Sequence, residues 1–288
     1  MTSRLITRKA AALGAAALLA VGVAVTEAPA VTAATAPYCG TTIHKADGTT
    51  WRCTFVDNFD GTRLNTAKWK VVTSNDADYR DRKDCFVNSS RNISVSSGIL
   101  RLTTRRTATF TCSHGTYAYQ ATGTSGMVST MGRFFQTYGR FQMRAKFPYT
   151  KTGPGLHGAF WLWPEGASGM TWPVSGELDV AEWYSKYPDR AIPYLHTATS
   201  WLSPSTATNN YCILKNPADW HTYTLEWTKQ RIVIKYDGKT CLDAAGGAPY
   251  NAPFNVSLTQ ATGVKKNAPT SSTPFPATMQ IAWVKVWK

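Results

Sequence analysis

The sequence predicts an all-β domain, a sandwich of two antiparallel sheets. Segments of alternating polar and apolar residues, bounded by Gly, Pro, Asn or Ser, recur along the chain in the pattern of many short strands. The pair Asp237-Gly238 between two such segments suits the positive φ angles of a tight hairpin turn. Residues 34–288 also match the size of one sandwich domain, about 200–250 residues.

The strands are expected in segments where the alternation is clearest, and no long helical period is found beyond the N-terminal region. These segments are 92–103, 139–147, 156–163, 194–199, 223–236 and 279–287. The stretch 251–276 is rich in Pro, Thr and Ser, so we expect it to include a long surface loop. No repeat or second domain is apparent.

Residues 1–33 have the pattern of a secretory signal peptide. Three basic residues precede an apolar run from 10 to about 25, and small residues at 28–30 and 31–33 offer two cleavage sites. The run is shorter than the roughly 20 residues of a membrane span, and no later segment is long enough. We therefore expect a secreted, extracellular protein with one domain over 34–288.

Six cysteines in an exported chain indicate disulfides, although six allow about fifteen connectivities. Proximity in the sequence favours Cys39–Cys53, Cys85–Cys112 and Cys212–Cys241. No Cys/His spacing resembles a zinc site.

The chain is basic, with 31 Lys and Arg against 17 Asp and Glu and a formal net charge of +14. Such a charge suits nucleic acid, an anionic cell-wall polymer or an acidic polysaccharide, or simply favours solubility and wall adhesion. The basic residues are scattered, and nothing resembles a nucleic-acid module. No nucleic-acid partner is expected.

Three carboxylates lie within six residues, in the otherwise apolar run Glu177-Leu178-Asp179-Val180-Ala181-Glu182. Side chains two apart on a strand share a face, so Glu177 and Asp179 point the same way. Glu182 would face the core of a regular strand, where a charge is costly. A one-residue β-bulge near Val180 or Ala181 would return it to the polar face.

The spacing of these acids indicates glycoside hydrolysis. With the two glutamates leaning toward each other, their carboxyls would lie on the order of 5–6 Å apart, near the value of about 5–5.5 Å in glycosidases that retain anomeric configuration. Asp179 between them would raise the proton affinity of a neighbour and orient the nucleophile. The alternative is that these acids have no catalytic role and simply form the charged, solvent-facing side of a strand.

The run 176–182 resembles the signature of glycoside hydrolase family 16, in the bulged form of laminarinase-like enzymes. The resemblance extends over most of the chain beyond residue 33. It includes the segments 55–61, 138–141, 159–161, 220–223 and 284–286, together with Trp69, Glu226 and Trp227. It implies a jelly-roll sandwich with a concave substrate cleft, Glu177 as nucleophile, Glu182 as acid/base and Asp179 as the assisting acid, with no cofactor.

Five further residues are candidates for substrate binding. Trp161 offers a flat ring for the C–H face of a sugar, or packs in the core. Trp172, before the catalytic strand, would form a wall of the groove or cover the sheet edge. Arg144 would reach a sugar hydroxyl or a catalytic carboxylate, or lie on the surface. The resemblance makes His196 a candidate to hydrogen-bond near the acid/base. His157 stands where laminarinase-like relatives often have Trp, which weakens a β-1,3-glucan preference.

No metal ion is expected, because Ala282 occupies the position of an Asp that helps to bind calcium in many relatives. The predicted function is a secreted, monomeric, retaining endo-glycoside hydrolase of a β-linked polysaccharide, with β-1,3- or β-1,3/1,4-glucan as the leading substrate. The alternatives are a galactan or acidic-polysaccharide hydrolase, a transglycosylase and a non-catalytic carbohydrate-binding protein.

Overall fold

The computed structural model describes residues 37–288 apart from 77–81, 116, 149–152, 167–170, 201 and 203. The predicted signal peptide lies outside the described residues. The strands are β1 (Ile43–His44), β2 (Thr50–Trp51), β3 (Cys53–Asp57), β4 (Lys70–Val71), β5 (Asp84–Phe86), β6 (Ile93–Ser96), β7 (Ile99–His114), β8 (Tyr117–Ser129), β9 (Gly139–Lys146), β10 (Leu156–Pro164), β11 (Glu177–Tyr184), β12 (Ile192–His196), β13 (His221–Trp227), β14 (Arg231–Tyr236), β15 (Lys239–Ala245), β16 (Phe254–Thr262) and β17 (Ala277–Trp287). The described helices are α1 (Pro204–Ala207) and η1 (Lys265–Asn267), and neither is long and apolar enough to cross a membrane.

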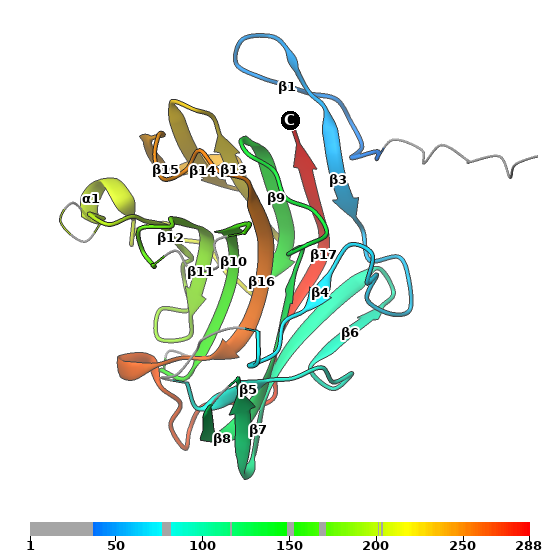
Figure 1. Cartoon of the computed structure of the whole chain (residues 1–288), viewed down its shortest axis with the longest axis vertical. Coiled ribbons are helices and arrows are strands. Elements are labelled where there is room, and N and C mark those ends of the chain that lie inside the picture. Colours follow the sequence, from blue (N-terminus) through cyan, green and yellow to red (C-terminus); the bar gives the residue numbers. More distant parts are fainter. Residues whose placement is uncertain are drawn as a thin grey trace, which may run out of the picture. The chain divides into compact units, whose positions relative to one another are not determined.

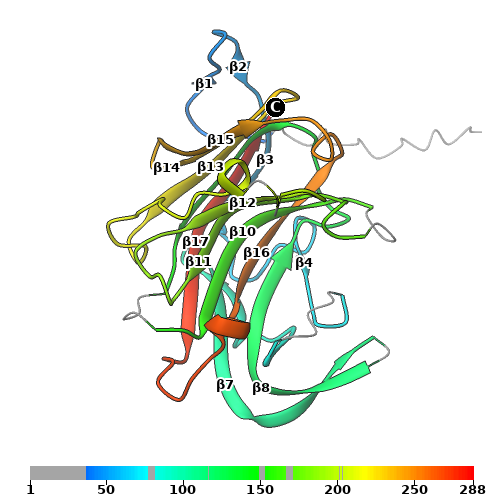
Figure 2. The ribbon, with the colours of Figure 1, turned by 90° about the vertical axis from the view of Figure 1, so that its left-hand side faces the viewer.

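The strands form two curved layers, which confirms the predicted all-β sandwich (Figure 1). One layer has the order β12-β11-β10-β16-β8, and the other the order β7-β17-β9-β13-β14-β15. The long strands β7 and β8 pair with each other and connect the layers at one end of the molecule (Figure 2). Neighbouring strands along both layers are antiparallel, whereas the short β5 pairs with β8 in parallel.

The main core lies between the two layers and explains which strand faces are free for a site. In β10, Phe160 and Leu162 are fully buried in this core, together with Leu178 and Val180 of β11. Successive side chains of a strand alternate, so Ala159 and Trp161 point to the opposite, outer face of the layer. They join a smaller cluster on that face.

Two of the expected strands are hairpins. Segment 223–236 forms β13 and β14, and segment 92–103 contains β6 and the first part of β7, which pair in antiparallel across residues 97–98. The long surface loop expected within segment 251–276 is present after residue 262, where it connects β16 to β17. The first part of the segment forms β16, which is buried throughout because it is a central strand covered on both faces. The predicted turn at Asp237-Gly238 is confirmed, with φ angles of 48° and 81° between β14 and β15.

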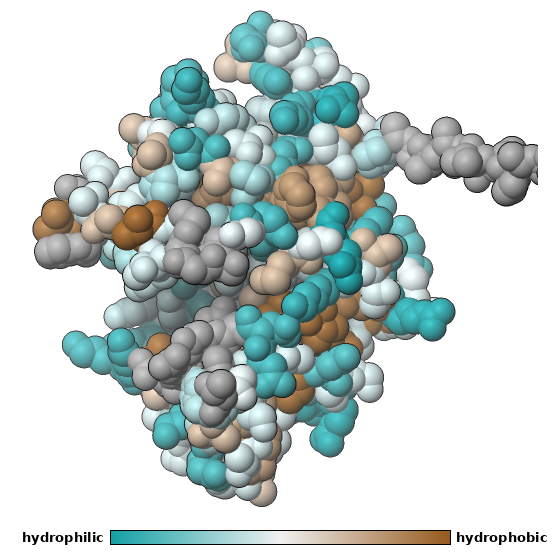
Figure 3. All heavy atoms as spheres, viewed as in Figure 1, coloured by the Kyte–Doolittle hydropathy of each residue, from teal (hydrophilic) through white to brown (hydrophobic). Residues whose placement is uncertain are grey.

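The three predicted disulfides are confirmed. Cys39–Cys53, Cys85–Cys112 and Cys212–Cys241 have Cα separations of 5.6, 5.8 and 5.5 Å. On the face shown in Figure 3, hydrophilic residues alternate with apolar ones and do not gather into one patch.

Candidate active site

A β-bulge in β11 brings the three acids to one face of the layer. Against β10, Phe160 pairs with Ala181 while the next residue, Trp161, pairs with Asp179, so Val180 has no partner. The register against β12 shifts at the same place, between Asp179 and Glu182. The predicted bulge is therefore confirmed: the extra residue resets the alternation, and Glu182 lies beside Ala159 on the outer face.

The bulge is supported from the other layer. Val180 and Ala181 remain in the core, and a bulge disrupts the hydrogen-bond ladder at the extra residue. The buried Tyr236 of β14 donates a hydrogen bond of 2.8 Å from its hydroxyl to the carbonyl oxygen of Val180. This contact satisfies a backbone acceptor that would otherwise be costly to bury.

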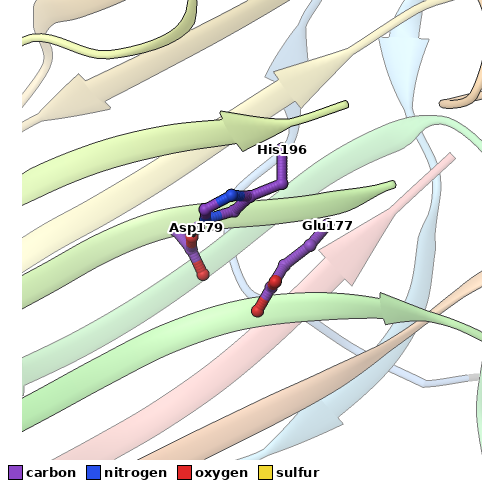
Figure 4. A group of neighbouring side chains, drawn as sticks. All are labelled: Glu177, Asp179 and His196. Atoms are coloured by element: carbon purple, nitrogen blue, oxygen red, sulfur yellow. Dashed lines mark ion pairs between the residues drawn. The ribbon is translucent and has the colours of Figure 1, made fainter. Parts of the chain in front are cut away.

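Glu177 and Asp179 each have a partner from a neighbouring segment. Trp172 donates from Nε1 to Oε2 of Glu177 at 2.7 Å. Nε2 of His196 lies 2.9 Å from Oδ2 of Asp179, and Figure 4 shows the imidazole lying against this carboxylate with Glu177 beside it. The ring of His196 stacks on Tyr194 with centroids 4.2 Å apart, and this packing orients it.

Glu182 has two partners of its own, both on the outer face. Tyr184 donates from its hydroxyl to Oε1 at 2.7 Å, and Nε2 of His157 lies 3.1 Å from the same oxygen. The rings of His157 and Tyr184 stack at a centroid distance of 4.7 Å. The two partners therefore form one rigid support for this carboxylate.

The surroundings shift the pKa values of the three acids in different directions. Burial, followed by the charge of Asp179, raises the pKa of Glu177 well above its usual value. Burial, followed by the charge of Glu182, also raises the pKa of Asp179. Burial likewise opposes ionisation of Glu182, but the hydrogen bonds and charge from His157 and the hydrogen bond from Tyr184 outweigh it and lower the pKa of Glu182.

This order of proton affinities is the reverse of what the expected roles require, because an acid/base residue starts the reaction protonated and a nucleophile starts it ionised. In the free site, protons are held more tightly by Glu177 and Asp179 than by Glu182. The physical reason is that Glu182 alone receives two hydrogen bonds at one oxygen, from His157 and Tyr184.

The structure brings four of the five expected binding residues to these acids. His157, Trp172 and His196 make the contacts given above. Trp161 is the cross-strand neighbour of Asp179, but only 9% of it is exposed, because it packs with Phe86 and Met127 and donates from Nε1 to Thr259 at 3.0 Å. Trp172 is 51% exposed, so it presents the more open ring.

Arg144 is not part of this site. It lies in β9 of the other layer, where its neighbours Met143 and Ala145 point into the core. By alternation Arg144 points to the opposite face of that layer, and its weak contact at 3.5 Å is with Thr222 of β13. The core separates it from the acids, so it reaches neither them nor a sugar bound to them.

Two residues of the site were missed by the sequence analysis. Tyr184 is two residues beyond Glu182, so the alternation that follows the bulge places both on one face and would have identified it. Tyr236 carries no local signal, because its contact with Val180 joins strands 56 residues apart in different layers.

Glu177, Asp179 and His196 offer ligand atoms that all lie within 4.8 Å of one another. This spacing would suit a cation, but the direct contact of His196 with Asp179 already provides each with a partner. The arrangement of paired carboxylates with separated proton affinities suits acid/base and nucleophilic chemistry.

Comparison with known proteins identifies the family. The family model of the glycosyl hydrolases family 16 matches residues 81–285. The chain is 28% identical over 260 residues to glucan endo-1,3-beta-glucosidase A1 of Niallia circulans, which covers 81% of this chain and 37% of the relative. It is 29% identical over 174 residues to keratan-sulfate endo-1,4-beta-galactosidase of Sphingobacterium multivorum, which covers 57% of this chain and 40% of that protein.

The chain thus spans well under half of the length of these two curated relatives. The X-ray structure of endo-beta-1,3-glucanase from Pyrococcus furiosus matches the fold with a TM-score of 0.74 at 23% identity, covering 86% of this chain and 97% of that chain. The family model alone covers most of the sandwich and includes the bulged strand with its three acids. The chain therefore belongs to glycoside hydrolase family 16.

Proposed function

We propose that this chain is a secreted glycosidase that cleaves within a β-linked polysaccharide and retains the anomeric configuration. The observation that carries the proposal is the bulge in β11, which places Glu177 and Glu182 on one face with Asp179 between them. Two glutamates fixed on one surface suit double displacement, in which one acts as nucleophile and the other moves protons.

In the proposed reaction, Glu182 protonates the glycosidic oxygen as the bond to the anomeric carbon breaks. A carboxylate oxygen of Glu177 attacks this carbon and forms a glycosyl ester. Glu182, now ionised, takes a proton from water, and the water oxygen displaces Glu177 and restores both groups. Asp179, held by His196, orients the nucleophile and exchanges a proton with its neighbours.

Only the form with ionised Glu177 and protonated Glu182 reacts in this scheme. In the free site the pKa of Glu177 is raised and that of Glu182 is lowered, so the reaction requires a proton to pass to Glu182 before it can act as the acid. The hydrogen bond that Trp172 donates to Glu177 favours the reactive form, because it lowers the pKa of Glu177. The scheme needs no cofactor.

The leading substrate is a β-1,3-glucan or a mixed β-1,3/1,4-glucan, because the Niallia circulans relative is a glucan endo-1,3-beta-glucosidase. A galactan or an acidic polysaccharide is the alternative. It is supported by the Sphingobacterium multivorum relative, a keratan-sulfate endo-1,4-beta-galactosidase. It is also supported by His157, which lies beside Glu182 at the position where laminarinase-like enzymes often have a Trp platform.

Two rival functions use the same sandwich. A transglycosylase would transfer the glycosyl ester to a sugar instead of water. A carbohydrate-binding protein would hold the polymer without cleaving it, but binding alone does not require two glutamates supported by separate hydrogen-bond partners. We propose secretion because three disulfides suit an oxidising compartment. We also propose that the protein is a monomer that acts on polysaccharide and has no nucleic-acid partner.

The test is release of reducing sugar by the purified protein from laminarin, mixed-linkage glucan, agarose, carrageenan and plant galactan. We expect release from laminarin or mixed-linkage glucan, with the β-anomer as the first product by NMR. Release from a galactan alone would replace the leading substrate, and an α-anomer would contradict retention. If neither the protein nor its Glu177→Gln variant cleaves any polymer although both bind one, the binding function is correct.

A further inference from the structure

Tyr250 lies in the main core behind the acids and contacts two parts of the site at once. It belongs to the segment that connects β15 of one layer to β16 of the other, and only 4% of it is exposed. Its hydroxyl donates to the carbonyl oxygen of His196 at 2.8 Å. Its ring faces Gly176, where a Cβ atom added to the glycine would lie 3.4 Å from Cε1 of the tyrosine. One side chain therefore contacts the residue that precedes Glu177 and the residue that holds Asp179.

The position of the imidazole depends on where β12 ends. His196 is the last residue of β12, the edge strand of its layer, and it pairs in register with Glu177. Its ring nevertheless reaches diagonally to Asp179, two residues further along β11 (Figure 4). The end of an edge strand pairs with one neighbour only and frays easily. The diagonal contact therefore depends on what else holds the end of β12.

Tyr250 is itself held firmly from the other layer. Its carbonyl oxygen accepts a hydrogen bond of 3.1 Å from Nε1 of Trp227, a fully buried residue of β13. The preceding residue, Pro249, also packs on Gly176, where an added Cβ atom would lie 2.7 Å from its Cγ. Gly176 has a φ of 79°, a conformation that favours glycine. The backbone before Glu177 and the end of β12 are thus fastened to the same segment.

The hydroxyl of Tyr250 stays protonated and remains a donor. Burial, followed by the charges of Asp179 and Glu177, raises the pKa of Tyr250. The hydrogen bond to His196 is therefore kept while the acids gain and lose protons during a reaction cycle.

We propose that Tyr250 is a positioning residue, which fixes the end of β12 relative to Glu177 and so keeps the imidazole of His196 on Asp179. The inference rests on the proposed function and assigns a further residue to the same reaction. Tyr250 acts through His196 and contacts neither a sugar nor the reacting atoms. Its influence on the reaction is therefore expected in kcat and in the pH profile, and not in KM.

The expected pH effect follows from the groups that face Glu177. These are Asp179 and Glu182 of its own strand, His196 of β12 and the donor Trp172. Burial and the charge of Asp179 raise the pKa of Glu177, whereas the charge of His196 lowers it. Glu177 must be ionised to attack, so displacement of His196 raises its pKa further. The acidic limb of the kcat/KM profile then moves to higher pH.

The test is Tyr250→Phe, which keeps the ring and removes the hydroxyl. The matched control is Tyr119→Phe, because the hydroxyl of Tyr119 also donates to a backbone carbonyl at 2.8 Å, that of Asp84. Tyr119 lies in β8, which does not pair with β11. Both variants lose a hydrogen bond of the same kind and length. A merely structural role of Tyr250 would therefore give the two variants similar urea unfolding and similar kinetics.

We expect Tyr250→Phe to lower kcat by about 10- to 100-fold, to leave KM nearly unchanged and to move the acidic limb to higher pH. Tyr119→Phe is expected to keep the kcat and pH profile of the wild type. A loss of stability in Tyr250→Phe with kcat and pH profile unchanged would overturn the proposal.

A second measurement does not depend on hydrolysis. The chain has five histidines, and comparison with His196→Gln assigns the ring signals of His196 in NMR spectra of isotope-labelled protein. The imidazole lies between the rings of Tyr194 and Trp172, with centroids 4.2 and 5.2 Å away, so its displacement changes these signals. We expect shifted signals in Tyr250→Phe and not in Tyr119→Phe.

Unshifted His196 signals in Tyr250→Phe would overturn the positioning role, whatever the kinetics. Failure of the proposed function has a different signature. If the signals shift but the wild-type protein cleaves no polymer, the positioning of His196 by Tyr250 is supported and hydrolysis is not.

Discussion

Asp84 and the acids of β11 differ in how their pKa values respond to removal from water. Asp84 of β5 is fully buried and accepts hydrogen bonds from the backbone and hydroxyl of Thr262 at 2.9 and 2.6 Å, from Ser125, and from Nε of Arg82 at 3.1 Å. Burial opposes its ionisation, yet Arg82 and these donors lower its pKa. Glu177 is also screened from water, but among the described residues its donor is Trp172 alone. Burial and the neighbouring charge of Asp179 therefore raise its pKa.

The difference shows that the partners, and not burial itself, decide whether a buried acid stabilises the fold. Asp84 accepts hydrogen bonds from Ser125 of β8 and Thr262 of β16 and forms an ion pair with Arg82. Its carboxylate therefore links β5 to β8 and β16. The three acids of β11 repel one another and have few donors. Such a site costs stability, and carboxylates with strongly shifted proton affinities gathered on one surface are typical of functional sites.

The largest expected effect is on activity. Glu177→Gln removes the proposed nucleophile and is expected to lower kcat by at least about 10⁴-fold, while Glu182→Gln is expected to lower it by about 10²–10⁴-fold. Steady-state kinetics on the polymer found above would measure both. Asp243→Asn, in an exposed pair with Arg231, is the control and should leave kcat unchanged. Near-normal kcat in Glu177→Gln would show that the nucleophile lies elsewhere.

The next effect is on stability, and it would distinguish Asp84 most clearly from the acids of β11. Asp84→Asn places an amide among donors and removes the negative charge beside Arg82, so we expect a loss of about 3–5 kcal/mol in the free energy of unfolding at pH 7. Because the folded pKa of Asp84 is lowered, its contribution is present above the unfolded pKa of about 3.9 and is lost as pH falls through the folded value. Urea unfolding over pH would show the difference from wild type shrinking in acid; a constant difference would contradict the ion-pair explanation.

Glu177→Gln is expected to change the free energy of unfolding in the opposite direction. The folded pKa of Glu177 is raised, so wild-type stability falls as pH rises from the unfolded value of about 4.3 toward the folded one. The Gln variant avoids this loss and should be more stable than wild type at pH 7 and equal to it below about pH 4. A less stable variant at neutral pH would show that the charge is compensated after all.

A smaller effect is expected at the contact that supports the bulge. Tyr236→Phe leaves the carbonyl of Val180 without its donor and is expected to cost about 1–3 kcal/mol and to lower kcat through misplacement of Glu182. Tyr223→Phe is the matched control, because the buried hydroxyl of Tyr223 has no partner among the described residues, so its loss should not destabilise. Equal effects of the two changes would argue against a special role for the bulge contact.

The smallest effect is a shift of the pH profile. His157→Phe keeps a ring on Tyr184 but removes the hydrogen bond to Glu182, so the pKa of Glu182 should rise. The limb of the kcat/KM profile that Glu182 controls is then expected to move to higher pH. His44→Phe, at an exposed position in β1, should leave the profile unchanged. An unshifted profile in His157→Phe would mean that Tyr184 alone sets the pKa of Glu182.

The sequence by itself determined the parts of this protein that depend on local rules. Alternation predicted the strands and showed that Glu182 needs a bulge near Val180, the pair Asp237-Gly238 predicted its hairpin, and proximity predicted the three disulfides. These features follow from backbone geometry within a few residues or from closure of short loops.

The tertiary structure alone decided what lies across the sheets. It placed Arg144 behind the core, made β16 a buried strand where composition indicated a loop, and brought Tyr236 to Val180 from the other layer. It also set the order of proton affinities, since the pKa of a buried acid depends on partners such as His157 and His196 that lie far away in the sequence. Packing and desolvation act through space, and a residue's own neighbours in the chain do not specify them.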